Sequence, residues 1–193
     1  MEIRNLAENT EDFTGNVWLL ENSETVLVDA GEGDVWQNIK ELEKIDKVVL
    51  THSHHDHIKN LPKIKEKFDP EVYAFNPGNI PVKAQKITEA EKIELCSQEF
   101  EVFHTPGHLD DSICLYSSSE QILFTGDLIF PEGKFGRTDL DQGNREKLID
   151  SIKKIVGLDV ESFYPGHGEA VEVNANKWIK KSLDNAERRE PKY

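Results

Sequence analysis

Metal-binding side chains are concentrated in one short segment of the sequence. Residues 51–57 read Thr-His-Ser-His-His-Asp-His and follow an apolar, strand-like run. Because side chains alternate between the two faces of an extended chain, His52 and His54 are expected to point the same way and could hold one metal ion. Asp56 and His57 come where the chain must turn into a helix, so they could face a second ion. Zinc and similar divalent metals bind imidazole nitrogen together with carboxylate oxygen.

Three further candidate ligands follow predicted strands later in the chain. His108 lies in a Thr-Pro-Gly-His sequence, Asp127 in Thr-Gly-Asp, and His167 in Tyr-Pro-Gly-His-Gly. Glycine and proline shape tight turns, and functional groups are often found where such turns follow the strands of a rigid scaffold. The combination favours a metal centre over a polar loop with incidental histidines. His55 and His104 are expected outside this centre, as an exposed side chain and as a hydrogen-bonded strand residue.

Hydrophobic periodicity predicts the elements that must position these side chains. Apolar runs indicate strands at residues 17–20, 25–28, 47–51, 71–75, 100–104, 113–116, 122–125 and 160–164. Helical spacing of apolar residues predicts helices at residues 35–45, 58–68, 145–156 and 174–188. Two packed sheets with helices outside them would fit this order of elements.

Composition and charge exclude several classes of protein. The chain has 193 residues and a net charge of −14, a field that disfavours nucleic-acid and membrane partners. We expect one domain spanning residues 1–193, acting as a monomer or homodimer on a small-molecule substrate. Two scattered cysteines, a polar start to the chain and the lack of a run of about 20 apolar residues favour a cytoplasmic location.

The candidate ligands carry a resemblance to a known family. In order and spacing, the motif His52-x-His54-x-Asp56-His57 and the later ligands resemble the metallo-β-lactamase-fold hydrolase superfamily, and Asp29 in Val-Asp-Ala-Gly matches that family's early strand-end aspartate. The resemblance covers residues from about 15 to about 170. It implies an α/β fold, a four-layer αβ/βα sandwich of two mixed β-sheets with outer helices.

The same resemblance implies a role for each ligand. His52, His54 and His108 would hold one metal ion, while Asp56, His57 and His167 would hold a second. Asp127 would bridge both ions. Asp29 would orient the loop that carries the ligands, because metal ligands generally need hydrogen-bonding partners that hold them in place. The implied cofactors are two divalent ions, zinc first, with iron or manganese as options. Asp56 and Asp127 would also be the catalytic carboxylates.

The branch of the superfamily is indicated by the segment that follows Asp127. The sequence Phe-Thr-Gly-Asp-Leu-Ile-Phe and the later Gly-Arg-Thr-Asp resemble short glyoxalase II-like (hydroxyacylglutathione hydrolase-like) proteins and persulfide dioxygenases. Arg137 falls where glyoxalase II uses a lysine to bind the carboxylate of its thiol substrate. The resemblance therefore implies a binuclear hydrolase that cleaves anionic acyl thioesters through a metal-bridging hydroxide.

The ligand motif is shared by several activities within the superfamily. His52, His108 and Asp127 could form the two-histidine, one-carboxylate face of a mononuclear iron persulfide dioxygenase. That arrangement would leave Asp56 as an unpaired buried carboxylate, which is costly, so two ions fit the charges better. The same residues would also suit a phosphodiesterase or nuclease, a lactonase, a lactamase or a non-catalytic metal-binding module.

Overall fold

Two mixed β-sheets, each carrying helices, organise the chain. The computed structural model describes residues 1–188, and contacts divide the chain into two units. The first unit comprises Met1–Ile87 and Glu94–Gln98, and the second comprises Thr88–Ile93 and the chain from Glu99 onward. The single domain of residues 1–193 stays a prediction, and residues 189–193 lie outside the described residues.

The sheet of the first unit has six strands in the order of the sequence. These strands are β1 (Glu2–Asn5), β2 (Trp18–Glu21), β3 (Thr25–Val28), β4 (Lys47–Val49), β5 (Glu71–Ala74) and β6 (Gln85–Lys86). Antiparallel pairing joins β1 to β2 and β2 to β3, while β3, β4, β5 and β6 run parallel. Because parallel strands end at the same edge of a sheet, the loops after β3 and β4 meet there.

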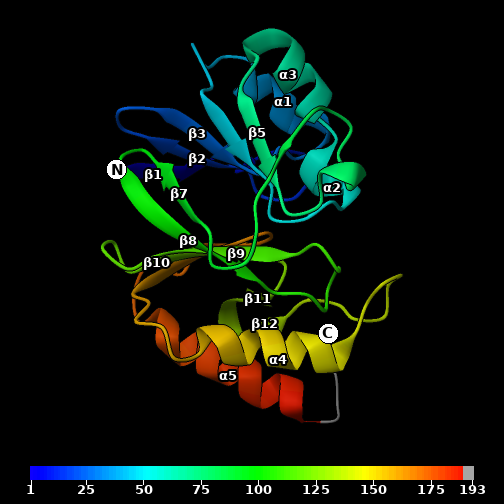
Figure 1. The fold of residues 1–193 in the computed structure, drawn as a ribbon, viewed down its shortest axis with the longest axis vertical. Helices are drawn as coiled ribbons and strands as arrows, with labels where there is room; N and C mark the ends of the chain where they lie inside the picture. Colours follow the sequence, from blue (N-terminus) through cyan, green and yellow to red (C-terminus); the bar gives the residue numbers. More distant parts are fainter. Residues whose placement is uncertain (189–193) are drawn as a thin grey trace. The chain divides into compact units, whose positions relative to one another are not determined.

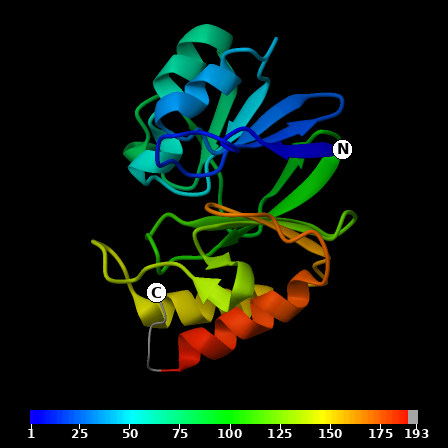
Figure 2. The same cartoon turned by 180° about the vertical axis from the view of Figure 1, so that it is seen from behind.

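The first unit also contains five short helices. They are η1 (Gly33–Val35), α1 (Trp36–Ile39), α2 (His55–Ile58), α3 (Leu61–Phe68) and η2 (Pro77–Asn79). Figures 1 and 2 show α1 and α3 on the same side of the strands, and their buried Ile39 and Ile64 pack in one core with Leu27 and Val48 of the sheet.

Two predicted helices of the first unit differ from the observed ones. The helix predicted over residues 35–45 is an α-helix only over Trp36–Ile39. Beyond it, the amides of Glu41 and Leu42 bond to carbonyls three residues back, so the last turn tightens and the helix ends. The helix predicted over residues 58–68 is observed as α3, which begins at Leu61, while Ile58 is the last residue of α2. Pro62 lies in the first turn of α3, where its missing N–H costs nothing.

The sheet of the second unit has the strand order β13-β10-β9-β8-β7. Its strands are β7 (Lys92–Leu95), β8 (Gln98–His104), β9 (Ile113–Ser117), β10 (Ile122–Gly126) and β13 (Ser162–Pro165). β10 pairs with β13 in parallel and with β9 antiparallel. A separate hairpin of β11 (Ile129–Phe130) and β12 (Lys134–Phe135) encloses η3 (Pro131–Gly133).

Two longer helices pack on the second sheet. α4 (Arg145–Ile155) and α5 (Ala175–Glu187) lie next to each other below it in both views (Figures 1 and 2). Their buried Ile152 and Ile179 join Leu123 and Phe163 in one core. The predicted α/β class with two mixed sheets and helices is confirmed. Within residues 1–188, no helix combines the length and apolarity that crossing a membrane requires.

Candidate metal centre

The edge after β3 and β4 holds four of the predicted ligands, which we call the first ligand group: His52, His54, Asp56 and His57. His52 lies three residues after the end of β4, His54 is the N-cap of α2, and the other two lie within α2. The ring of His52 lies 4.9 Å from that of His54 and 4.1 Å from that of His57, centroid to centroid. The Asp56 Oδ2 atom lies 3.9 Å from His57 Nε2. The spacing seen in the sequence therefore does bring these side chains together within the first unit.

Asp29 orients the first ligand group. Its carboxylate is buried and accepts three bonds of 2.8 Å, from the Thr51 amide, the Thr51 hydroxyl and His57 Nδ1. A carboxylate is an acceptor only, so His57 must carry its proton on Nδ1, which makes Nε2 the metal-binding nitrogen. Since the Thr51 hydroxyl donates to Asp29, it accepts from His52 Nδ1 at 3.0 Å. One carboxylate thus sets the tautomer of two histidines.

Gly15 is a contact of His57 that the sequence did not reveal. A Cβ atom at Gly15 would lie 2.7 Å from His57 Cε1 and 2.8 Å from Nε2. The Gly15 amide also donates to the Asp56 carbonyl at 3.1 Å. Only a residue without a side chain lets this loop pass so close to the His57 ring.

The second unit holds the other three predicted ligands, the second ligand group: His108, Asp127 and His167. Asp127 Oδ2 lies 3.4 Å from His108 Nε2 and 3.5 Å from His167 Nε2. Two ligands on one tetrahedral ion, with bonds of about 2.0–2.2 Å, lie about 3.4 Å apart. The donor atoms therefore fit a metal ion, and Asp127 is near both histidines, as a bridging carboxylate must be.

Parallel strands and main-chain contacts position the second ligand group. Gly126 at the end of β10 is in register with Pro165 of β13, so Asp127 and His167 leave the sheet at one edge. His108 Nδ1 donates to the Arg137 carbonyl at 2.8 Å, which turns its Nε2 toward Asp127. This role of the Arg137 backbone had no signal in the sequence, since any residue offers a carbonyl.

The side chain of Arg137, predicted to bind substrate, already has a partner. Its guanidinium donates to both carboxylate oxygens of Asp139 at 3.0 and 2.8 Å, and 57% of the side chain is exposed. The pairing with Arg137 holds the pKa of the Asp139 carboxyl below its ordinary value. An anionic substrate would therefore compete with Asp139 for this guanidinium.

The remaining histidines and cysteines have structural surroundings. His55 is exposed with Nδ1 2.8 Å from Glu32 Oε2, and His104 Nε2 lies 2.8 Å from the Asp110 carbonyl, which confirms both predictions for these residues. Cys96 and Cys114 are free and buried. Burial raises the pKa of Cys114 to about 12, so this thiol is not a nucleophile near neutral pH.

Comparisons with known proteins match most of the chain. A family model described as the metallo-beta-lactamase superfamily matches residues 10–78 and 75–167. The hydroxyacylglutathione hydrolase GloC of Haemophilus influenzae is 30% identical over 186 residues, covering 83% of this chain and 87% of that protein. The atrochrysone carboxyl ACP thioesterase of Aspergillus fumigatus is 29% identical over 181 residues, covering 87% of this chain and 54% of that protein. The crystal structure of ETHE1 from Myxococcus xanthus gives a TM-score of 0.78 at 24% identity, covering 100% of this chain and 93% of that one, and shows the likeness of fold alone.

Several curated relatives are longer than the region matched here. The chain spans 58% of the hydroxyacylglutathione hydrolase of Aliivibrio fischeri, to which it is 34% identical, and 54% of the fungal thioesterase. The activities and substrates in these names are properties of those proteins.

Asp29→Asn tests the role of the buried carboxylate. The substitution keeps the size of the side chain and tolerates the left-handed backbone at φ 66°. We expect zinc affinity, measured by competition with a chromogenic chelator, to fall about 10- to 100-fold. Asp69→Asn is the matched control, because Asp69 is also left-handed, at φ 51°, but is exposed at the end of α3. Equal zinc affinity in the two variants would contradict this role.

Gly15→Ala tests the close approach to His57. The added methyl group must displace the imidazole ring, so we expect weaker zinc binding and a lower melting temperature than in the unsubstituted protein. Gly157→Ala is the control, since a Cβ there meets no atom within 4 Å. If Gly15→Ala binds zinc as tightly as Gly157→Ala, the contact does not position the ligand.

Proposed function

This chain belongs to the metallo-beta-lactamase superfamily, and from that premise we propose that it is a hydrolase that uses two divalent metal ions to cleave thioesters. The family match confirms the resemblance predicted from the ligand motif. In this proposal, all seven candidate ligands hold the two metal ions in one binuclear centre. These ligands are His52, His54, Asp56, His57, His108, Asp127 and His167.

The substrate class is supported by the relatives. One is named a hydroxyacylglutathione hydrolase and another an ACP thioesterase. The acyl group is bonded to sulfur in the substrates of both. The proposal rests mainly on the two ligand groups. In each unit, imidazole and carboxylate donors lie close together where strands of the sheet end.

The donor set fits borderline divalent ions such as zinc, with iron or manganese as options. When bound, two such ions supply Lewis acidity to the acyl carbonyl and to the attacking water. The residues of the chain fix the geometry: Asp29 orients His52 and His57, and the Arg137 carbonyl orients His108. This preorganisation spares the protein a rearrangement during the reaction.

The proposed reaction is a simple hydrolysis. Water adds to the acyl carbon, the carbon–sulfur bond breaks, and its electron pair leaves with the sulfur as a thiolate. The proton lost by water passes to the oxygen of the Asp56 carboxylate that does not hold a metal ion, and this side chain, 21% exposed, can return it to solvent. Because a thiolate is a good leaving group, the reaction needs no strong general acid. We further propose a cytoplasmic, single-domain enzyme that is a monomer or homodimer.

Metal loading combined with two substrates tests the proposed function. Metal-free protein is loaded with zinc or iron(II) and supplied with S-lactoylglutathione or with glutathione persulfide. We expect thiol release from the thioester and no oxygen consumption with the persulfide. Asp127→Asn should lose metal and activity together, while the exposed Asp150→Asn should keep both.

The opposite pattern identifies a different reaction. Oxygen consumption by the iron form with persulfide, and no thioester cleavage by either form, would replace the hydrolase by a persulfide dioxygenase.

Arg137→Ala tests the proposed anion-binding side chain. We expect KM for a carboxylate-bearing thioester to rise about tenfold, the effect of losing one charged hydrogen-bonded pair. The value of kcat should change less, because the backbone carbonyl that holds His108 remains. Lys147→Ala, which removes an exposed cation paired with Asp110, is the control. An unchanged KM would show that the Arg137 guanidinium pairs with Asp139 and does not bind the substrate.

A further inference from the structure

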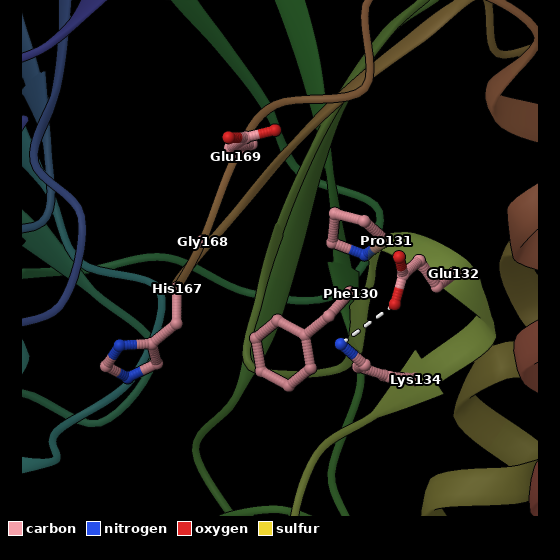
Figure 3. A pocket seen from close by; sticks show the side chains of 7 residues that line it. All are labelled: Phe130, Pro131, Glu132, Lys134, His167, Gly168 and Glu169. Atoms are coloured by element: carbon pink, nitrogen blue, oxygen red, sulfur yellow. Dashed lines mark ion pairs between the residues drawn. The ribbon is translucent and has the colours of Figure 1, made fainter.

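A pocket lies beside the candidate ligand His167 within the second unit. Its volume is about 380 Å³, and it is lined by Phe130, Pro131, Glu132, Lys134, His167, Gly168 and Glu169 (Figure 3). Small-molecule sites generally have volumes of about 300–1,000 Å³. The Phe130 ring lies 6.3 Å from the His167 ring, centroid to centroid. Part of a substrate that reacts at the metal centre can therefore lie here.

The wall formed by the β11–β12 hairpin is held firmly in place. Phe130 and Lys134 face each other across the hairpin. From α5, the buried Ser182 hydroxyl donates to the Lys134 carbonyl at 2.9 Å, and the Asn185 amide donates to the Gly133 carbonyl at 2.8 Å. These bonds anchor the main chain of the hairpin and leave the side chains of Phe130 and Lys134 to line the pocket.

The charges of the lining do not balance. Lys134 Nζ lies 3.0 Å from Glu132 Oε2, and this pairing holds the pKa of the Glu132 carboxyl below its ordinary value. Glu169, at another edge of the pocket in Figure 3, makes no ion pair or hydrogen bond with any residue between 1 and 188. The lining thus has one carboxylate in excess, and it also contains the aromatic ring of Phe130. Both groups attract organic cations.

We propose that this pocket receives the leaving thiol of the substrate and that Glu169 and Phe130 select thiols that carry an ammonium group. The inference rests on the proposed thioester hydrolysis. Glu132, Gly168 and Glu169 are exposed, so the pocket opens to water and the released thiol can leave directly. The preference concerns the part of the thiol that lies in this pocket, whereas the proposed role of Arg137 concerns a carboxylate of the substrate.

Three acetyl thioesters that differ in thiol charge test this proposal. Acetylthiocholine carries a quaternary ammonium group, S-(3,3-dimethylbutyl) thioacetate is its neutral isostere, and S-acetyl-3-mercaptopropionate is anionic. For the zinc-loaded protein, we expect kcat/KM to be highest for the cation and lowest for the anion. The ratio of cation to neutral isostere should be about three- to tenfold, as exposed ion pairs and cation–π contacts give.

Two variants should move this ratio in opposite directions. Glu169→Gln removes the excess carboxylate and should bring the cation-to-neutral ratio to about unity. Lys134→Met releases Glu132 from its ion pair and should raise the ratio. Glu172→Gln is the matched control, because Glu172 is exposed three residues beyond Glu169 and does not line the pocket. It should leave the ratio as in the unsubstituted protein.

The outcomes separate this inference from the proposed function. Hydrolysis of the neutral thioester without a preference for the cation, or a ratio that Glu169→Gln leaves unchanged, overturns the inference and leaves thioester hydrolysis standing. Hydrolysis of none of the three thioesters by the zinc-loaded or the iron-loaded protein overturns the proposed function, and the thiol pocket with it.

Discussion

The buried carboxylate of Asp29 is the constraint on which the first ligand group depends. Burying a charge is costly unless it is paired and hydrogen-bonded, and Asp29 satisfies this with three short bonds to Thr51 and His57. Its left-handed backbone, at φ 66°, turns the chain at the end of β3 so that its carboxylate meets the loop after β4. Two loops that are distant in the sequence are thereby joined, and the Nδ1 atoms of His52 and His57 are fixed.

The second ligand group is held in another way, by the main chain. His108 binds the carbonyl of Arg137, and a Cβ at Gly136 would lie 1.9 Å from the Asp127 carbonyl oxygen. The loop of His108 is tied to α4, since Ser151 donates to the Pro106 carbonyl. Ligand geometry in this unit therefore depends on close backbone packing, which only glycine permits at position 136.

The sequence predicted the ligands better than it predicted the scaffold. His52 and His54 were identified without any knowledge of the fold, because imidazole is a strong metal ligand and the two residues are spaced by two in the sequence. They lie in the loop between β4 and α2 rather than on a strand. Five strands within residues 1–188 were not predicted: β1, β6, β7, β11 and β12. β1 and β7 have four residues each and alternate charged or polar with apolar side chains, and the other three have only two residues each. Contacts made by backbone atoms, such as the Arg137 carbonyl, could not be predicted, since they leave no residue signature.

We propose that the two ligand groups form one binuclear centre, and anomalous X-ray diffraction from crystals of the zinc-loaded protein would locate the metal ions. We expect two peaks about 3.5–4 Å apart, as in other two-metal sites. One peak should contact His52, His54 and His108, the other should contact Asp56, His57 and His167, and Asp127 should lie between them. A single peak, or zinc bound away from these residues, would contradict the account.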